Sequence, residues 1–514
     1  MESRQALSSG NSGQMVSRRT FLRGATAVLA QCAIQTHGKV LAAPSMERDV
    51  SRPSSSKPNF IIVLTDDLDQ ETCSPDYMPY LQQYMVQEGL TFTTFAANAS
   101  LCSPSRASLL RGQYVHNHGV RSNDARIGGF AELYRRGIES STLATELKAA
   151  GYRTAFLGKY MNGYPLYTAP TYIPPGWDEW CALCATPQYY DYQMNVNGTL
   201  VQFGTSKSDY LTDVLSLRAT ECISQAASAQ VPFFLLIAPY APHGPSTPAR
   251  RHLTMFADEI APRTPSFNEE DVSSKPAYIR DSSMLTEEEI LRLDKIRRNR
   301  LCCIQAVDEM IRDLFEALTS MGLDDNTYVI FASDNGILLG QHRIPSRKAV
   351  PYEEATIVPC IIRGPGISRA DRSDKLVGIV DIMPTILDLA GCMIPSYVDG
   401  RSLRLFLHGE DCPDWRQVFL IENEASDEEI LFGIPLYYGL RTTNLKYVEY
   451  ATGERELYDL DLDPYELNNR YTNTPMATKN MLSCWLQGIQ TSAGAALREQ
   501  ELYHIWLPVT GATR

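Results

Sequence analysis

A cysteine that begins a short helix-forming segment carries the clearest chemistry in this sequence. Residues 102–106 read Cys-Ser-Pro-Ser-Arg, and residues 107–112 continue as a turn with apolar flanks that ends in glycine. Cys102 is therefore expected at a helix N-terminus, where free N–H groups and the helix dipole favour anions. Arg106, one turn further on, adds a forked cationic donor beside it. The alternative is a buried structural cysteine at the start of a helix.

After residue 57, apolar runs alternate with amphipathic segments, which is the pattern of a parallel α/β sheet. Four of these runs end in polar residues and are expected as strands, at residues 59–65, 152–157, 232–238 and 327–333. In open α/β sheets, sites form outside the carboxyl ends of the strands. The four polar endings are therefore expected to converge on one crevice.

Two of these endings predict a metal site. Asp66 and Asp67 follow the first run, and Asp334 and Asn335 follow the last. They offer only hard oxygen ligands, which suit Ca²⁺ or Mg²⁺ better than zinc. The alternative for Asp66 and Asp67 is a loop or a helix-capping pair, and the alternative for Asp334 and Asn335 is a tight turn. Calcium tolerates irregular oxygen coordination, whereas magnesium demands an octahedron, and the residues alone leave both ions open.

The bulk composition limits the class of partner. The chain has 514 residues, enough for about two domains, and a formal net charge of −13. That charge argues against binding to nucleic acid or to an anionic membrane surface. An anionic substrate must therefore be held by a local basic pocket. Twelve cysteines in a chain of this length do not indicate a disulfide framework.

The N-terminus has the order of an export signal. Arg18 and Arg19 precede an apolar run at 24–34 and small residues that end near Ala42. Residues 1–42 therefore resemble a twin-arginine signal peptide, which predicts export to the periplasm or secretion. The apolar run is too short for a stable membrane anchor. Residues 43–57, rich in serine, proline and charge, are expected to be a disordered lead-in.

The segment 102–112 resembles the signature C-x-P-S-R-A-x-L-L-T-G of type I sulfatases, with Arg111 in place of threonine. In that family a formylglycine-generating enzyme oxidises the cysteine after translation, and the hydrated aldehyde is the nucleophile. The resemblance extends from about residue 58 to residue 466 and is closest to N-acetylglucosamine-6-sulfatases and related glycan sulfatases. It implies an alkaline-phosphatase-like fold, with a large mixed sheet flanked by helices at 58–400. A small C-terminal α+β domain is implied at 401–514, with strands at 441–450 and 456–460.

The resemblance also implies a role for each polar residue. Calcium, held by the four oxygen residues, also contacts the formylglycine made from Cys102. The negative charge of the sulfuryl oxygens is neutralised by three cationic side chains: Arg106, Lys159 and Lys348. Asp334 accepts a proton from the nucleophile, and His243 or Lys348 gives one to the leaving oxygen. Lys159 and His243 end the second and third runs, and Lys348 begins a K-x-x-x-Y-E element.

A second position departs from the family pattern, besides Arg111. Many arylsulfatases have a histidine where this chain has Met161, so its work would fall to Asn162 or His118. His342 stands where relatives often carry a histidine that faces substrate, against the alternative of a surface loop residue.

Sugar recognition has its own candidates. Trp177 and Trp180 are expected either to lie against a sugar face or to belong to the core. Four polar residues would then reach the hydroxyl groups of the sugar or a neighbouring acid, or else they merely order a loop: His116, His118, Arg121 and Asn123.

Three hypotheses about function follow. The leading one is a calcium-dependent hydrolase of sulfated carbohydrates, such as N-acetylglucosamine 6-sulfate, or of aryl sulfates. The second is a phosphonate or phosphate ester hydrolase of the same superfamily. The third is a non-catalytic binder of sulfated glycans that keeps its cysteine unmodified.

Overall fold

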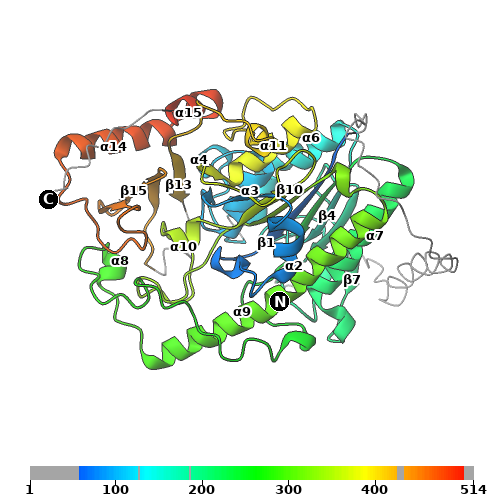
Figure 1. The fold of residues 1–514 in the computed structure, drawn as a ribbon, viewed down its shortest axis with the longest axis horizontal. Coiled ribbons are helices and arrows are strands. Elements are labelled where there is room, and N and C mark those ends of the chain that lie inside the picture. Colours follow the sequence, from blue (N-terminus) through cyan, green and yellow to red (C-terminus); the bar gives the residue numbers. More distant parts are fainter. Residues whose placement is uncertain (1–56, 126–127, 185–186, 425–432, 503–514) are drawn as a thin grey trace, which may run out of the picture.

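The computed structural model describes residues 57–125, 128–184, 187–424 and 433–502 (Figure 1). The predicted signal peptide at 1–42 lies outside these residues, as does all but the last residue of the predicted lead-in at 43–57. Within the described part, every helix is too short or too polar to cross a membrane.

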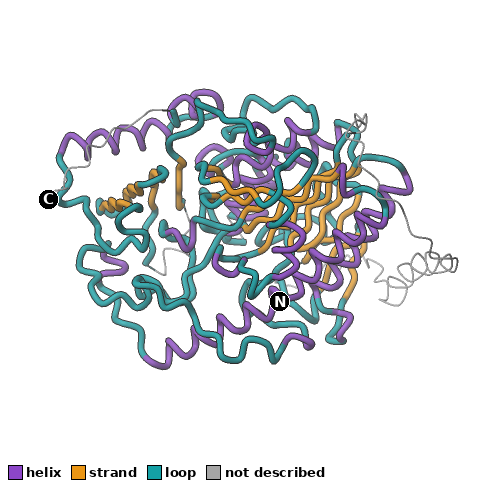
Figure 2. The backbone as a smooth tube through the Cα atoms, viewed as in Figure 1, coloured by secondary structure: helices purple, strands orange, loops and turns teal. Residues whose placement is uncertain are grey.

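A ten-stranded mixed sheet forms the centre of the molecule (Figure 2). The four predicted strands all form and are its four neighbouring central strands, aligned in parallel. Strands buried on both faces are apolar along their whole length, as these runs are. In sheet order the strands are β11 (Asp371–Ser373), β2 (Leu90–Phe92), β10 (Cys360–Arg363), β9 (Thr327–Ser333), β1 (Asn59–Thr65), β8 (Phe233–Ala238), β4 (Arg153–Gly158), β5 (Glu179–Leu183), β6 (Gln193–Val196) and β7 (Thr199–Gln202).

Helices cover both faces of this sheet. On one face, α7 (Leu211–Ala229) and α9 (Glu287–Ser320) pack against Ile61 and Val63 of β1. On the other, α3 (Cys102–Arg111), α6 (Leu143–Ala149) and α11 (Ile382–Leu389) share a core with Phe60 and Ile62. Successive side chains of β1 thus belong alternately to the cores on the two faces of the sheet. The remaining short elements are α2 (Pro79–Leu81), β3 (Phe95–Ala96), α4 (Val115–His118), α5 (Gly129–Arg135), α8 (Ala277–Arg280), α10 (Glu353–Thr356), β12 (Val377–Gly378) and α12 (Arg404–Leu407).

A second, four-stranded antiparallel sheet lies beside the first (Figure 1). It consists of β13 (Phe419–Asn423), β14 (Tyr437–Arg441), β15 (Leu445–Tyr450) and β16 (Arg455–Asp459), followed by α14 (Met476–Gln490) and α15 (Gly494–Gln500). The predicted strand at 441–450 is wrong at its start. Residue 441 is the last residue of β14, residues 442–444 form a turn, and β15 begins at residue 445. One hydrophobic core includes residues of both sheets, so the boundary near residue 400 stays a prediction.

A buried ion pair links the small sheet to α4, next to α3. One carboxylate oxygen of Glu422 accepts a hydrogen bond of 2.6 Å from the backbone N–H of Val115, and the other lies 2.9 Å from Nδ1 of His116. Nε2 of His116 lies 3.1 Å from the carbonyl oxygen of Ser492. Burial would lower the pKa of His116, but Glu422 outweighs it and raises that pKa to about 9. The ring is therefore a protonated link between the small sheet and α4, and not the sugar ligand expected from the sequence.

The pH dependence of stability tests this link. Because the pKa of His116 is about 9 in the folded state and near 6.5 in the unfolded chain, the folded state binds this proton more tightly. The stabilisation is complete below pH 6.5 and is lost as the pH rises towards 9, by about 3 kcal/mol. Urea unfolding of the wild type and His116→Gln between about pH 6 and 10 measures it. Equal losses in both proteins would contradict the assignment.

Candidate active site

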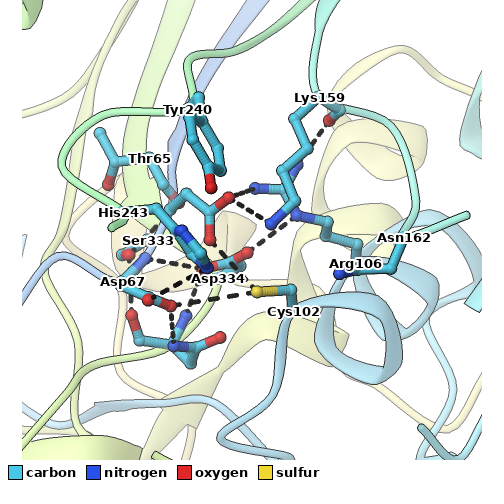
Figure 3. A network of polar contacts seen from close by, with 12 residues as sticks. Thr65, Asp67, Cys102, Arg106, Lys159, Asn162, Tyr240, His243, Ser333 and Asp334 are labelled. Carbon is cyan, nitrogen blue, oxygen red and sulfur yellow. Dashed lines mark hydrogen bonds and ion pairs between the residues drawn. The ribbon is translucent and has the colours of Figure 1, made fainter. Parts of the chain in front are cut away.

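The polar endings of the central strands meet at one edge of the large sheet, opposite the N-terminus of α3 (Figure 3). Loops after β1, β4 and β8, the segment between β9 and α10, and helix α3 supply the side chains. Hydrogen bonds and ion pairs bring together nine of the eleven predicted site residues: Asp66, Asp67, Cys102, Arg106, Lys159, His243, Asp334, Asn335 and Lys348.

Cys102 is the first residue of α3 and is completely buried. Its Sγ donates to Oδ1 of Asp66 at 3.2 Å and accepts from Nζ of Lys348 at 2.7 Å. Burial, together with the charge of Asp66, raises the pKa of the thiol to about 12. Since the thiolate is the reactive form of cysteine, an unmodified Cys102 is a poor nucleophile at neutral pH.

Two carboxylates beside the thiol are ionised because lysines pair with them. Asp66 forms an ion pair with Lys159, and Asp67 forms one with Lys348. Burial alone would raise both carboxyl pKa values, but these lysines hold them below their usual range. Asp67 in turn keeps the pKa of Lys348 well above its ordinary value, despite burial. The lysines therefore stay positively charged where an anion would bind.

Asp334 is held in place by donors on both oxygens. Its Oδ1 accepts from the backbone N–H groups of Asp67 at 3.1 Å and Asn335 at 2.8 Å. Its Oδ2 accepts from Nε of Arg106 at 2.8 Å. Burial and the neighbouring charge of Asp66 raise the pKa of Asp334, in contrast to the other two carboxyls. The group is therefore the most basic carboxylate of the cluster.

The cluster also fits a hard cation. Oδ1 of Asn335 is buried and has no hydrogen-bond partner, while Nδ2 of the same amide donates to Asp67 at 2.7 Å. Ligand atoms of Asp66, Asp67, Cys102 and His243 lie within 4.8 Å of one another. A buried carbonyl oxygen without a donor, set among carboxylates, is a ligand set that hard divalent ions prefer.

His243 stands at the more open side of the cluster, with 27% of its side chain exposed. Nδ1 donates to the carbonyl oxygen of Gly244 at 2.7 Å, and Nε2 lies 3.6 Å from Oδ2 of Asp67. Burial lowers the pKa of His243 even though Asp67 is close. The ring stacks on Tyr240, which also lies 5.5 Å from Nζ of Lys159 and was not predicted. The sequence could have indicated Tyr240 only by its position three residues before His243.

Two predicted substrate contacts are wrong. Nε2 of His118 lies 3.0 Å from the hydroxyl of Ser108, and Nδ1 accepts from the N–H of Val120 at 3.0 Å, so protein groups occupy both nitrogens. His342 is completely buried, stacks on Tyr352 at 4.0 Å and bonds to Glu269 at 2.8 Å. It is neither a substrate ligand nor a surface residue.

The predicted sugar platform is also wrong, and the core alternative is confirmed. Trp177 and Trp180 are 7% and 1% exposed and pack against Phe156. Arg121 pairs with Glu424. These residues build and order the fold next to the site.

The residue after Cys102 is fixed by two asparagines. The N–H of Ser103 donates to Oδ1 of Asn123 at 2.9 Å, and its hydroxyl donates to Oδ1 of Asn162 at 3.0 Å. Asn162 therefore stands beside the start of α3, while Met161 is buried.

Family comparisons agree with this site. The sulfatase family profile matches residues 58–392, and the profile of the N-sulphoglucosamine sulphohydrolase C-terminal region matches residues 340–490. Human N-acetylglucosamine-6-sulfatase is 31% identical over 475 residues, which cover 86% of each chain. An extracellular sulfatase Sulf-1 homolog from Caenorhabditis elegans is 39% identical over 378 residues, which cover 71% of this chain and 52% of that protein. The chain belongs to the sulfatase family and is a sulfuric ester hydrolase.

Solved structures share the fold. A protein in complex with its substrate D-glucosamine-2-N,6-O-disulfate aligns with a TM-score of 0.72 and 24% identity, over 87% of this chain and 99% of that one. A phosphonate monoester hydrolase from Silicibacter pomeroyi aligns with a TM-score of 0.66 and 24% identity, over 83% of this chain and 93% of that one. The predicted alkaline-phosphatase-like fold is confirmed.

Removing Arg106 tests the charge balance of the site. Arg106→Ala leaves the carboxylate of Asp334 buried without its cation, which costs about 3–5 kcal/mol of unfolding free energy. Arg135→Ala is the control, because Arg135 is 57% exposed and its pair with Glu132 contributes less than about 1 kcal/mol. Urea denaturation of both variants measures the difference. A cost for Arg106→Ala no larger than that of the control would contradict this view of the cluster.

Proposed function

We propose that this protein hydrolyses sulfate esters of carbohydrates, with N-acetylglucosamine 6-sulfate as the first candidate substrate. It does so through a formylglycine made from Cys102 and one calcium ion. The observation that carries the proposal is the buried thiol of Cys102, whose raised pKa makes it inert as a cysteine among cations that suit a sulfate group. The likeness to human N-acetylglucosamine-6-sulfatase over most of both chains supports the choice of sugar.

The modified residue and the ion have defined tasks. Hydrated formylglycine supplies a hydroxyl nucleophile where the thiol lies, and calcium adds positive charge beside it. Four side chains provide the oxygen ligands: Asp66, Asp67, Asp334 and Asn335. We choose calcium because these ligands are all hard oxygens in an irregular arrangement.

The protein's own side chains bind the sulfate and move the protons. Lys159 and Lys348 face the sulfuryl oxygens, and Arg106 holds Asp334 in place. Asp334 accepts the proton of the nucleophile, which its raised pKa favours. Such fixed charges stabilise the transition state because they need no rearrangement during the reaction.

The leaving oxygen needs a proton donor, and the two candidates in the cluster are Lys348 and His243. Lys348 holds its proton tightly, because its pKa lies well above the ordinary value. His243 has a lowered pKa and stands at the open side of the cluster. His243 in its protonated form is therefore the acid, and Lys348 acts through its charge.

Oxidation of Cys102 gives the direct test of function. The peptide that contains residue 102 should be lighter by about 18 Da than the cysteine form, because an oxygen replaces SH and H. Cys102→Ala should lose all turnover of 4-nitrophenyl sulfate and of N-acetylglucosamine 6-sulfate. Cys484→Ala, at an exposed cysteine, is the matched control and should keep full turnover.

Two outcomes would contradict this assignment. Full activity in a preparation whose Cys102 is quantitatively unmodified would exclude the mechanism. Faster turnover of an aryl phosphonate than of the matching aryl sulfate would favour the phosphonate hydrolase alternative.

Calcium removal tests the metal. Chelation should abolish turnover and lower the melting temperature, because three carboxylates would then lose one of their balancing cations. Calcium should restore both properties in the wild type but not in Asp67→Asn. Unchanged activity and melting temperature in protein shown by elemental analysis to be metal-free would contradict the proposal.

We also propose that the protein works outside the cytoplasm and is exported by the twin-arginine route. The residues Arg18 and Arg19 before an apolar run support the route. The extracellular sulfatase relative supports the location.

A further inference from the structure

A second group of buried ionisable side chains lies where α10 meets the small sheet (Figure 1). His342 precedes α10, Glu354 belongs to it, and Glu466 follows β16. One ligand atom of each lies within 4.8 Å of the other two. His342 is 0% and Glu466 is 1% exposed, and Glu354 is mostly buried. None of the roles derived above uses these three side chains.

Glu269 fixes the protonation of the His342 ring. Nδ1 lies 2.8 Å from Oε2 of Glu269. Because an ionised carboxylate only accepts, Nδ1 donates and the lone pair of the ring is on Nε2. Burial, together with the charges of Lys275 and Lys446, holds the pKa of His342 well below its ordinary value, so the ring is neutral. A neutral imidazole whose second nitrogen donates to a carboxylate is the form in which histidine usually binds metal ions.

Nε2 of His342 faces another acceptor. It is buried and has no hydrogen-bond partner among the described residues, and Oε2 of Glu354 lies 4.0 Å away. Two acceptors that face each other out of water are unfavourable unless a cation or a donor lies between them. Zinc bonds of about 2.0–2.2 Å join ligand atoms about 3.4 Å apart at the tetrahedral angle. A small rotation of the glutamate side chain therefore brings both atoms to one ion.

The negative charge of this group exceeds what its neighbouring lysine balances. Nζ of Lys446 lies 2.8 Å from Oε1 of Glu353 and 2.8 Å from Oε1 of Glu466, so two carboxylates share it. Burial still raises the pKa of Glu466 to about 7, and it raises the pKa of Glu354 above its ordinary value. A bound divalent cation would stabilise the ionised form of both carboxyls.

We propose that His342, Glu354 and Glu466 bind a divalent transition-metal ion, separate from the calcium proposed for the active site. One imidazole and two carboxylates suit zinc or a similar ion, whereas calcium takes oxygen ligands. His342 lies in the segment that carries Lys348, and Glu466 follows the last strand of the small sheet. The ion therefore stabilises the contact between that segment and the C-terminal part of the chain.

His252 provides a matched control. It is 6% exposed, its Nε2 lies 3.1 Å from Oε1 of Glu309, and its Nδ1 has no hydrogen-bond partner among the described residues. Within that part of the chain, however, it belongs to no group of three or more metal-ligating side chains. His252→Gln therefore removes a buried histidine beside a carboxylate without removing a proposed ligand.

Calorimetric titration with zinc chloride gives the first test. It is done at pH 8 with saturating calcium, so that the carboxyls are ionised and the active-site ligands are engaged. The wild type should bind zinc at this site with a Kd of about 1 μM or below. His342→Gln should weaken binding by roughly 100-fold or more, and Glu269→Gln by about 10–100-fold. His252→Gln should bind as the wild type does. No zinc binding to the wild type, or equal affinity in His342→Gln, would overturn the proposal.

Anomalous X-ray scattering gives a second test that needs no variant. In wild-type crystals grown with zinc and calcium, a zinc peak should lie about 2.0–2.1 Å from Nε2 of His342. Zinc found only among the active-site carboxylates, or a water molecule between His342 and Glu354 in place of the ion, would overturn the proposal.

Discussion

Burial of three carboxylates at one edge of a sheet is the constraint on which the centre of this structure depends. Carboxylates taken out of water are costly, and neighbouring ones repel each other. Three cations from separate parts of the chain compensate them, so the site forms only when these segments have assembled. The carboxylates are Asp66, Asp67 and Asp334, and the cations are Arg106, Lys159 and Lys348.

The same charges decide what residue 102 can do. A thiol next to Asp66 and out of water keeps its proton, even with Lys348 at 2.7 Å. An unmodified cysteine would therefore gain little from the surrounding cations. A side chain that carries hydroxyl groups would instead place its reacting oxygen among them, and the orphaned oxygen of Asn335 would gain a partner if a hard cation bound beside it. The proposed modification of Cys102 and the proposed metal thus both suit the same arrangement of buried charges.

The sequence predicted the position of the site better than the orientation of its neighbours. Apolar runs with polar endings were enough to place β1, β4, β8 and β9, because the carboxyl ends of parallel strands share one edge. His118 and His342 could not be judged this way. Their rings turn inward to Ser108 and Glu269, partners that only the tertiary fold brings near.

The predicted sugar platform of two tryptophans was wrong for a related reason. Trp177 and Trp180 suit a sugar platform or a core equally well, and packing against Phe156 decided for the core.

The most direct measurement is a crystal structure of the active protein that resolves the side chain at residue 102 and identifies any ion beside it. We expect an aldehyde or its hydrate at this position. We also expect a calcium ion about 2.3–2.6 Å from oxygen atoms of Asp66, Asp67, Asp334 and Asn335. An unmodified thiol in fully active protein, with no ion among these four residues, would contradict it.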